Sequence, residues 1–126
     1  MDEIKFCLDT YALVEIKLGN PKFNNFLNSK FVVNDITLAE FYSVLLREEN
    51  EATSDYWFKK FENYSIPVSR EILKKAVKFR HENKKSGISF FDAVGYIFSR
   101  SKGYKFVTGD KEFRKFIERG VEFVGK

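Results

Sequence analysis

Short apolar runs alternate with amphipathic segments along the whole chain. The runs 4–8, 31–33, 104–107 and 121–124 are bounded by polar residues or glycine, and such short continuous runs are typical of strands buried on both faces. Pro67 lies in a very short fifth run, 66–68, where it biases its predecessor toward extended backbone. We therefore predict four to five strands.

The segments between these runs carry apolar residues at helical spacing. Leu38, Phe41 and Leu45, for example, repeat on one face of a 3.6-residue period. Helices are expected at 11–18, 21–27, 37–50, 54–64, 70–85, 89–102 and 111–118. The helix at 89–102 is apolar nearly all round, which is typical of a buried helix.

Strands that alternate with helices predict a parallel sheet with helical crossovers. We therefore expect an α/β fold, a three-layer α/β/α sandwich with a mainly parallel central sheet. A length of 126 residues suits one domain, 1–126.

Composition narrows the class of protein. A hydrophobic fraction of 44% supports a real core and excludes global disorder. No apolar run reaches the ~18 residues of a membrane helix, and the acidic start makes a poor secretory signal. The single cysteine, Cys7, excludes an internal disulfide and a multi-cysteine zinc site. We expect a cytoplasmic protein.

Two further features of the composition concern partners. The net charge of +4 permits a nucleic-acid partner without requiring one. Phenylalanine occurs 15 times, against about five at ordinary usage. A domain this small has limited room for aromatic rings in its core. We therefore predict that Phe23, Phe26, Phe58 and Phe61 form part of a homodimer or partner-protein contact.

Four acidic side chains follow or precede predicted strands, each near the start of a helix. They are Asp9, Glu40, Asp92 and Asp110. Each suits a local structural role, because Thr37 and Glu40 have the spacing of a capping box and anions are favoured at helix N-termini. Ligands of open α/β sheets, however, bind at the carboxyl ends of the strands. We therefore expect the four acids to converge.

Converging carboxylates repel one another, and their pKa values rise unless a cation neutralises them. Mg²⁺ and Mn²⁺ prefer such oxygen ligands, whereas a single histidine and a single cysteine disfavour zinc. All-carboxylate metal sites are typical of phosphodiester hydrolysis. The sequence therefore predicts one or two Mg²⁺ or Mn²⁺ ions at these acids.

The segments that carry the acids resemble the motifs of a known family. Residues 8–10 (Leu-Asp-Thr), 37–41, 89–93 and 108–113 (opening Thr-Gly-Asp) are similar, in this order, to the motifs of the PIN domain, and more narrowly of VapC-like toxin ribonucleases. The resemblance implies that Asp9, Glu40 and Asp92 are metal ligands. It implies that Asp110 serves a second metal position or its water, and that Thr10 and Thr108 support the site.

The same resemblance implies an activity and partners. The activity is Mg²⁺- or Mn²⁺-dependent endoribonuclease cleavage of RNA by water, which leaves a 5′-phosphate and a 3′-hydroxyl. The partners are an antitoxin protein and a second copy of the chain. A stand-alone RNA-processing nuclease and a PIN module that binds RNA or protein without cutting remain alternatives. A response-regulator receiver and a haloacid-dehalogenase-type phosphatase are disfavoured, because their acids stand elsewhere.

Several other side chains are candidates for RNA contact. Tyr96 follows Asp92 by one helical turn, where the family usually has small residues; it either stacks a base or fills the core. Arg100 and Lys102 are candidate phosphate contacts, as are the lysine pairs 59–60 and 84–85. His81 is expected on the solvated surface.

Overall fold

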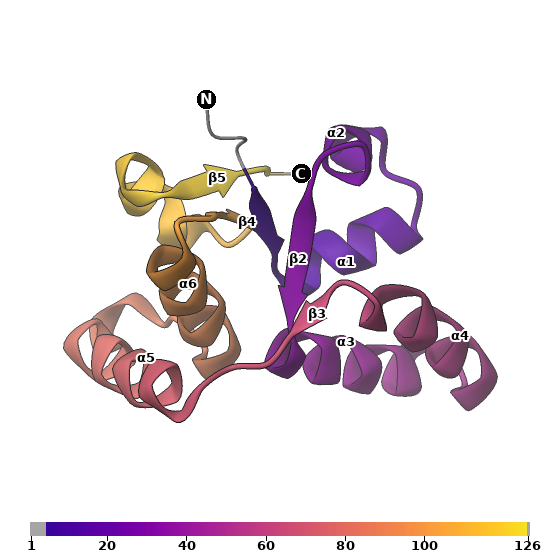
Figure 1. Cartoon of the computed structure of the whole chain (residues 1–126), viewed down its shortest axis with the longest axis horizontal. Helices are drawn as coiled ribbons and strands as arrows, with labels where there is room; N and C mark the ends of the chain where they lie inside the picture. Colours follow the sequence, from indigo (N-terminus) through magenta and orange to yellow (C-terminus); the bar gives the residue numbers. More distant parts are fainter. Residues whose placement is uncertain (1–4, 126) are drawn as a thin grey trace.

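A five-stranded parallel sheet forms the centre of the molecule (Figure 1). A computed structural model describes residues 5–125. The strands are β1 (Phe6–Leu8), β2 (Phe31–Asn34), β3 (Ser65–Ile66), β4 (Lys105–Thr108) and β5 (Val121–Phe123). Their order is β3-β2-β1-β4-β5, and all neighbouring pairs are parallel. This confirms the predicted sheet; residue 4 of the first run lies outside the described residues.

Helices cover both faces of the sheet, as the predicted sandwich requires. The helical elements are α1 (Thr10–Lys17), η1 (Pro21–Phe23), α2 (Asn24–Leu27), α3 (Asp35–Glu48), α4 (Glu51–Glu62), α5 (Arg70–Glu82), η2 (Lys84–Ser86), α6 (Phe90–Lys102) and η3 (Lys111–Arg119). Figure 1 shows α5 and α6 on one side of the strands and α1 to α4 on the other. Within residues 5–125, no helix combines the length and apolar character needed to cross a membrane.

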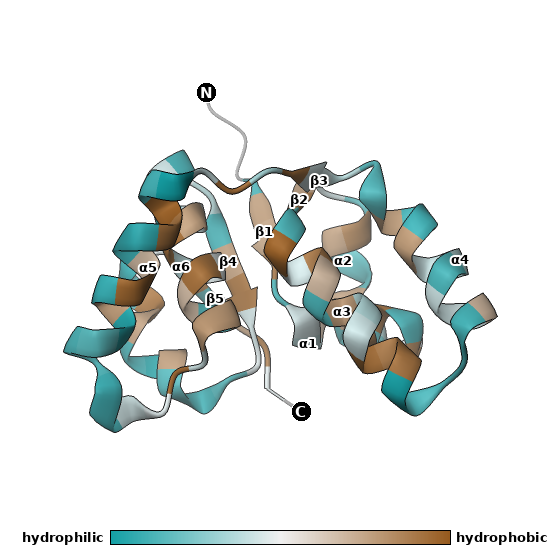
Figure 2. Cartoon of the chain, turned by 90° about the horizontal axis from the view of Figure 1, so that it is seen from below, coloured by the Kyte–Doolittle hydropathy of each residue, from teal (hydrophilic) through white to brown (hydrophobic). Residues whose placement is uncertain are grey.

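Alternate side chains of each strand enter different parts of the core. Leu8 and Val107 pack with residues of α1, α3 and α4, whereas Cys7 packs with Phe98 of α6. Phe106 packs against α6 and η3. The strands are therefore buried on both faces, which explains why they appear in the sequence as continuous apolar runs. Figure 2 shows hydrophobic residues along the strands, between the two helical layers.

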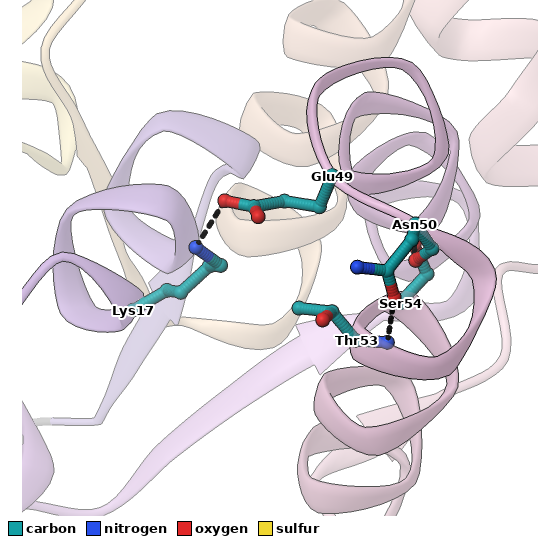
Figure 3. Close-up of polar contacts among 5 residues, drawn as sticks. All are labelled: Lys17, Glu49, Asn50, Thr53 and Ser54. Carbon is teal, nitrogen blue, oxygen red and sulfur yellow. Dashed lines mark hydrogen bonds and ion pairs between the residues drawn. The ribbon is translucent and has the colours of Figure 1, made fainter.

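The corner between α3 and α4 is held by polar contacts (Figure 3). The Asn50 side chain accepts a hydrogen bond from the Thr53 amide at 2.8 Å and so caps α4. Lys17 at the end of α1 pairs with Glu49 at 2.9 Å. Because both side chains retain solvent contact, that pair contributes at most about 1 kcal/mol.

Three expectations about the helices need correction. The expected helix 70–85 ends at Glu82, because Asn83 has φ −118° and ψ 28°, and a separate 3₁₀ turn follows. The segment 111–118 is a 3₁₀ helix rather than an α-helix. The segment 21–27 divides into a 3₁₀ turn and a short α-helix.

The predicted phenylalanine contact surface is also largely wrong. Phe23, Phe26 and Phe61 are at most 7% exposed and belong to the core of this chain. Only Phe58 is half-buried, with its ring 5.4 Å from that of Tyr42. Edge-to-face contacts between rings from different helices let the core hold more aromatic residues than we expected.

Candidate metal centre

Asp9 stands at the centre of the sheet, where the strand order reverses direction. β1 pairs with β2 on one side and with β4 on the other, and a crevice at such a switch point is the usual ligand site of an open α/β sheet. The Asp9 carboxylate accepts a hydrogen bond from the Ala12 amide at 2.7 Å and caps α1. Asp9 is only 2% exposed.

Glu40 reaches the site from α3, although not through the predicted capping box. The cap is Asn34, whose side chain accepts from the Thr37 amide at 2.8 Å, so α3 begins at Asp35 rather than at Thr37. Because Glu40 is not engaged at the helix start, its carboxylate is available to the cleft. It accepts a hydrogen bond from the Thr10 hydroxyl.

The other two acids come from the opposite side of the sheet. Ser89 caps α6 by accepting from the Asp92 amide at 3.1 Å, which leaves the Asp92 carboxylate unused by the cap. Asp110 follows β4; its amide donates to the Thr108 hydroxyl at 3.1 Å, and its carboxylate caps η3 through the Glu112 amide at 2.9 Å. Thr108 therefore fixes the backbone that carries Asp110.

All four acids line one cleft, as expected. Its volume is about 270 Å³, and its lining comprises Asp9, Thr10, Tyr11, Glu40, Asp92, Gly109 and Asp110. These residues come from four separated segments of the sequence: Asp9 and Asp110 follow the ends of β1 and β4, whereas Glu40 and Asp92 belong to α3 and α6. The parallel sheet therefore brings the carboxylates together.

The cleft makes negative charge costly. Burial raises the pKa of Asp9 to about 7, against opposing hydrogen bonds from Thr108 and Ala12. Burial, followed by the charges of Asp9, Asp110 and Glu40, raises the pKa of Asp92 to about 8. Burial also raises the pKa of Glu40, against the opposing effects of the hydrogen bond from Thr10 and the charge of Arg47. A cation in the cleft would remove this cost.

The donor set suits a hard divalent cation. Carboxylate oxygens are the ligands that Mg²⁺ and Mn²⁺ prefer, and neither histidine nor cysteine lines this cleft. Within residues 5–125, however, no three acidic, histidine or cysteine side chains already form a closed set around one point. The acids therefore line a shared cleft whose side chains would have to converge further on an ion.

Two lining residues were missed by the sequence analysis. Tyr11 packs over Gly109 so closely that a Cβ at Gly109 would lie 2.3 Å from the tyrosine ring. The glycine in the Thr-Gly-Asp segment is a signal that could have indicated this close approach.

The structure contradicts the expected RNA contact of Tyr96. Its side chain is 5% exposed and packs among Phe79, Phe113 and Phe116. The hydroxyl donates to the Arg119 carbonyl oxygen at 3.4 Å. Tyr96 is therefore the larger packing residue of the two alternatives, because η3 covers the helical face on which it lies.

Arg100 and Lys102 lie away from the acids, and their contact with RNA stays a prediction. Both lie in the last turn of α6, whereas Asp92 lies in the first, so about 12–15 Å of helix separates them from it. Arg100 donates to the Arg119 carbonyl oxygen at 2.9 Å. Lys102 lies over the Phe98 ring, with its Nζ 5.8 Å from the centroid.

Comparison with known protein families gives a match over most of the chain. The family described as PIN domain matches residues 6–118. The chain belongs to the PIN domain family. The match begins in β1, ends in η3 and therefore includes all four acids of this PIN domain. The comparison with curated proteins found no match.

Solved structures share the fold of this PIN domain. A chain of VapBC2 from Rickettsia felis, bound to a DNA fragment from their promoter, has a TM-score of 0.76 at 19% identity, covering 96% of this chain and 99% of that one. DNA-bound VapBC from Salmonella typhimurium has a TM-score of 0.75 at 19% identity, covering 97% and 98%. VapC20 from Mycobacterium tuberculosis, a sarcin-ricin loop cleaving toxin, has a TM-score of 0.73 at 17% identity, covering 96% and 99%. The fold is VapC-like.

Proposed function

We propose that this PIN domain is a metal-dependent endoribonuclease that hydrolyses phosphodiester bonds of RNA. The observation that carries the proposal is the single cleft in which Asp9, Glu40, Asp92 and Asp110 meet at the switch point of the sheet. Burying carboxylates whose pKa values are raised lowers the stability of the fold. Groups with such perturbed pKa values cluster at functional sites. The fold shared with VapC20, a sarcin-ricin loop cleaving toxin, supports RNA as the substrate.

The four carboxylates would hold one or two Mg²⁺ or Mn²⁺ ions. A bound ion would supply a water of lowered pKa and stabilise charge on the leaving oxygen. The protein residues orient the ligands. The Ala12 amide fixes one oxygen of Asp9, the Thr10 hydroxyl directs Glu40, and Thr108 holds the turn that carries Asp110. Hydrolysis by water would leave a 5′-phosphate and a 3′-hydroxyl, with no covalent enzyme intermediate.

We also propose that the chain is the toxin of a toxin–antitoxin pair and that it forms a homodimer. The VapBC chains that share its fold support this partner class. Expression of the chain should arrest growth, and co-expression of an adjacent small gene should relieve the arrest. Growth that continues on expression, despite RNA cleavage by the purified protein, would indicate the stand-alone nuclease instead. Sedimentation velocity measures the dimer.

The deciding experiment is cleavage of RNA with Mg²⁺ or Mn²⁺, with and without EDTA. Asp92→Asn should lower the rate by roughly 10²-fold or more, because even residues that only support a metal ligand cost 10–100-fold. Glu118→Gln removes an exposed carboxylate on η3 and is the matched control. No cleavage by the wild type, or equal cleavage by Asp92→Asn, would refute the proposed activity.

A further inference from the structure

A second and larger cavity lies beside the start of α6. Its volume is about 560 Å³, and it lies between the end of α5, η2 and the loop that enters α6. Its lining residues are Val77, Arg80, His81, Lys84, Gly87, Ile88, Ser89 and Phe90. None of them belongs to the acidic cleft.

The charge of this basic cavity is of one sign. Arg80, His81 and Lys84 line it, and no acidic residue does. The Arg80 Nε donates to the Ile88 carbonyl oxygen at 3.0 Å, which holds the guanidinium at the wall and leaves its terminal nitrogens available. Within residues 5–125 the one ion pair is between Lys17 and Glu49. The basic side chains of the cavity therefore have no carboxylate partner in the described part of the chain.

The basic cavity and the acidic cleft lie next to each other along the chain at the start of α6. Ser89 lines the basic cavity and its hydroxyl accepts from the Asp92 amide at 3.1 Å, while Asp92 lines the acidic cleft. Three residues of helix correspond to about 5 Å along its axis. A polyanion that reached the acids would therefore have the edge of the basic cavity at Ser89 within the span of a neighbouring nucleotide.

The wall of the basic cavity also offers apolar surface. Phe90 is half-buried, and Val77 is 55% exposed in the last turns of α5. An aromatic face beside cations is the combination that holds single-stranded nucleic acid, since bases stack and phosphates pair. An acidic peptide would use the cations but would gain little from the ring.

We propose that the basic cavity binds a nucleotide that flanks the scissile bond of a single-stranded RNA. Its phosphate contacts Arg80 and Lys84, and its base lies against Phe90. This inference rests on the proposed function and names its substrate class. Single-stranded RNA follows because a base must be unpaired and unstacked to reach an aromatic side chain.

The test measures binding of a short, fluorescently labelled single-stranded RNA in EDTA, so that no divalent ion bridges RNA and acids and no cleavage occurs. Lys84→Glu should weaken binding about 10-fold, and Lys84→Ala should reduce the slope of log Kd against log salt by about one. Lys22→Glu is the matched control, because Lys22 is an exposed lysine of another helical element, η1, and does not line the basic cavity. It should bind more tightly than Lys84→Glu and close to wild type.

The stacking contact has its own test. An RNA with one abasic nucleotide, moved along the strand, should lose affinity for the wild type at one position, and Phe90→Leu should abolish that positional loss while retaining the melting temperature. Equal effects of Lys84→Glu and Lys22→Glu, or an unchanged abasic profile in Phe90→Leu, would overturn the inference. So would a polyglutamate peptide that binds as tightly as the RNA. A failure of the proposed function gives a different result from a failure of this inference. In that case the RNA would still bind through Lys84, but it would not be cut with any divalent ion.

Discussion

At the scale of single residues, structural and functional roles coincide in some of the acids and separate in others. Asp9 caps α1 and Asp110 caps η3, yet both line the acidic cleft. Asp92 and Glu40 cap nothing, because Ser89 and Asn34 serve α6 and α3. A capping carboxylate stabilises its helix even when no ligand is bound. The Asp92 carboxylate caps no helix, and its burial destabilises the folded protein. Substitution of Asp92 therefore separates the two roles.

Asp92→Asn should stabilise the metal-free protein at about pH 8. Burial and neighbouring carboxylates raise the pKa of Asp92 to about 8, so folding at that pH must either bury a charge or take up a proton, and the amide needs neither. We expect a melting temperature higher by several degrees in EDTA, measured by calorimetry. Glu118→Gln should leave it unchanged, and a lower melting temperature for Asp92→Asn would contradict the argument.

Gly109→Ala should lower both stability and RNA cleavage. Its Cβ would lie 2.3 Å from the Tyr11 ring, so the ring or the turn that carries Asp110 must move. Overpacking of this kind costs about 1–3 kcal/mol, which urea unfolding measures. In a Tyr11→Ala background the same substitution should cost much less. Equal costs in both backgrounds would show that the ring contact is not the cause.

At the scale of elements, α6 determines how the two sides of the site meet. It supplies Asp92 at its start and packs tightly on β4, where Gly95 contacts Phe106. A Cβ at Gly95 would lie 2.5 Å from the Phe106 ring. The glycine therefore allows the helix to approach the sheet, and that approach brings Asp92 toward Asp9.

Gly95→Ala should destabilise the protein although alanine favours helix. The propensity gain is about 1 kcal/mol, whereas a helix forced away from a packed sheet loses about 1–3 kcal/mol. We therefore expect Gly95→Ala to lower the free energy of unfolding, measured with urea. Combining it with Phe106→Leu should recover part of the lost stability. Ser101→Ala, at an exposed position of the same helix, is the control. A stabilising Gly95→Ala would show that the helix shifts at no cost.

At the scale of the whole molecule, a chain of net charge +4 gathers four of its 18 acidic residues in one cleft at the centre of the sheet. The raised pKa values mean that the folded state binds more protons than the unfolded chain above about pH 4, the ordinary value for Asp9 and Asp92. The stability that these carboxyls contribute is therefore present at low pH and is lost as the pH rises toward about 8.

This sign gives a prediction for metal binding. In EDTA the melting temperature should fall between about pH 5 and pH 8, and Mg²⁺ or Mn²⁺ should restore it more at the higher pH. An ion at 100 times its Kd contributes about 2.7 kcal/mol. Sodium chloride of equal ionic strength is the control, and Asp92→Asn should reduce the response. Equal stabilisation by sodium would argue against a specific metal site.

The sequence by itself determined the alternation of strands and helices, the parallel sheet and the four acids, because hydrophobic periodicity and strand ends are local properties. It could not determine whether Tyr96, Phe23 and Phe61 are buried, since burial depends on which helices cover which face. It also missed Asn34 as the cap of α3 and the contact of Gly109 with Tyr11. Only the tertiary structure formed the basic cavity, because α5 and η2 bring Arg80 and Lys84 together with Ser89 at the start of α6.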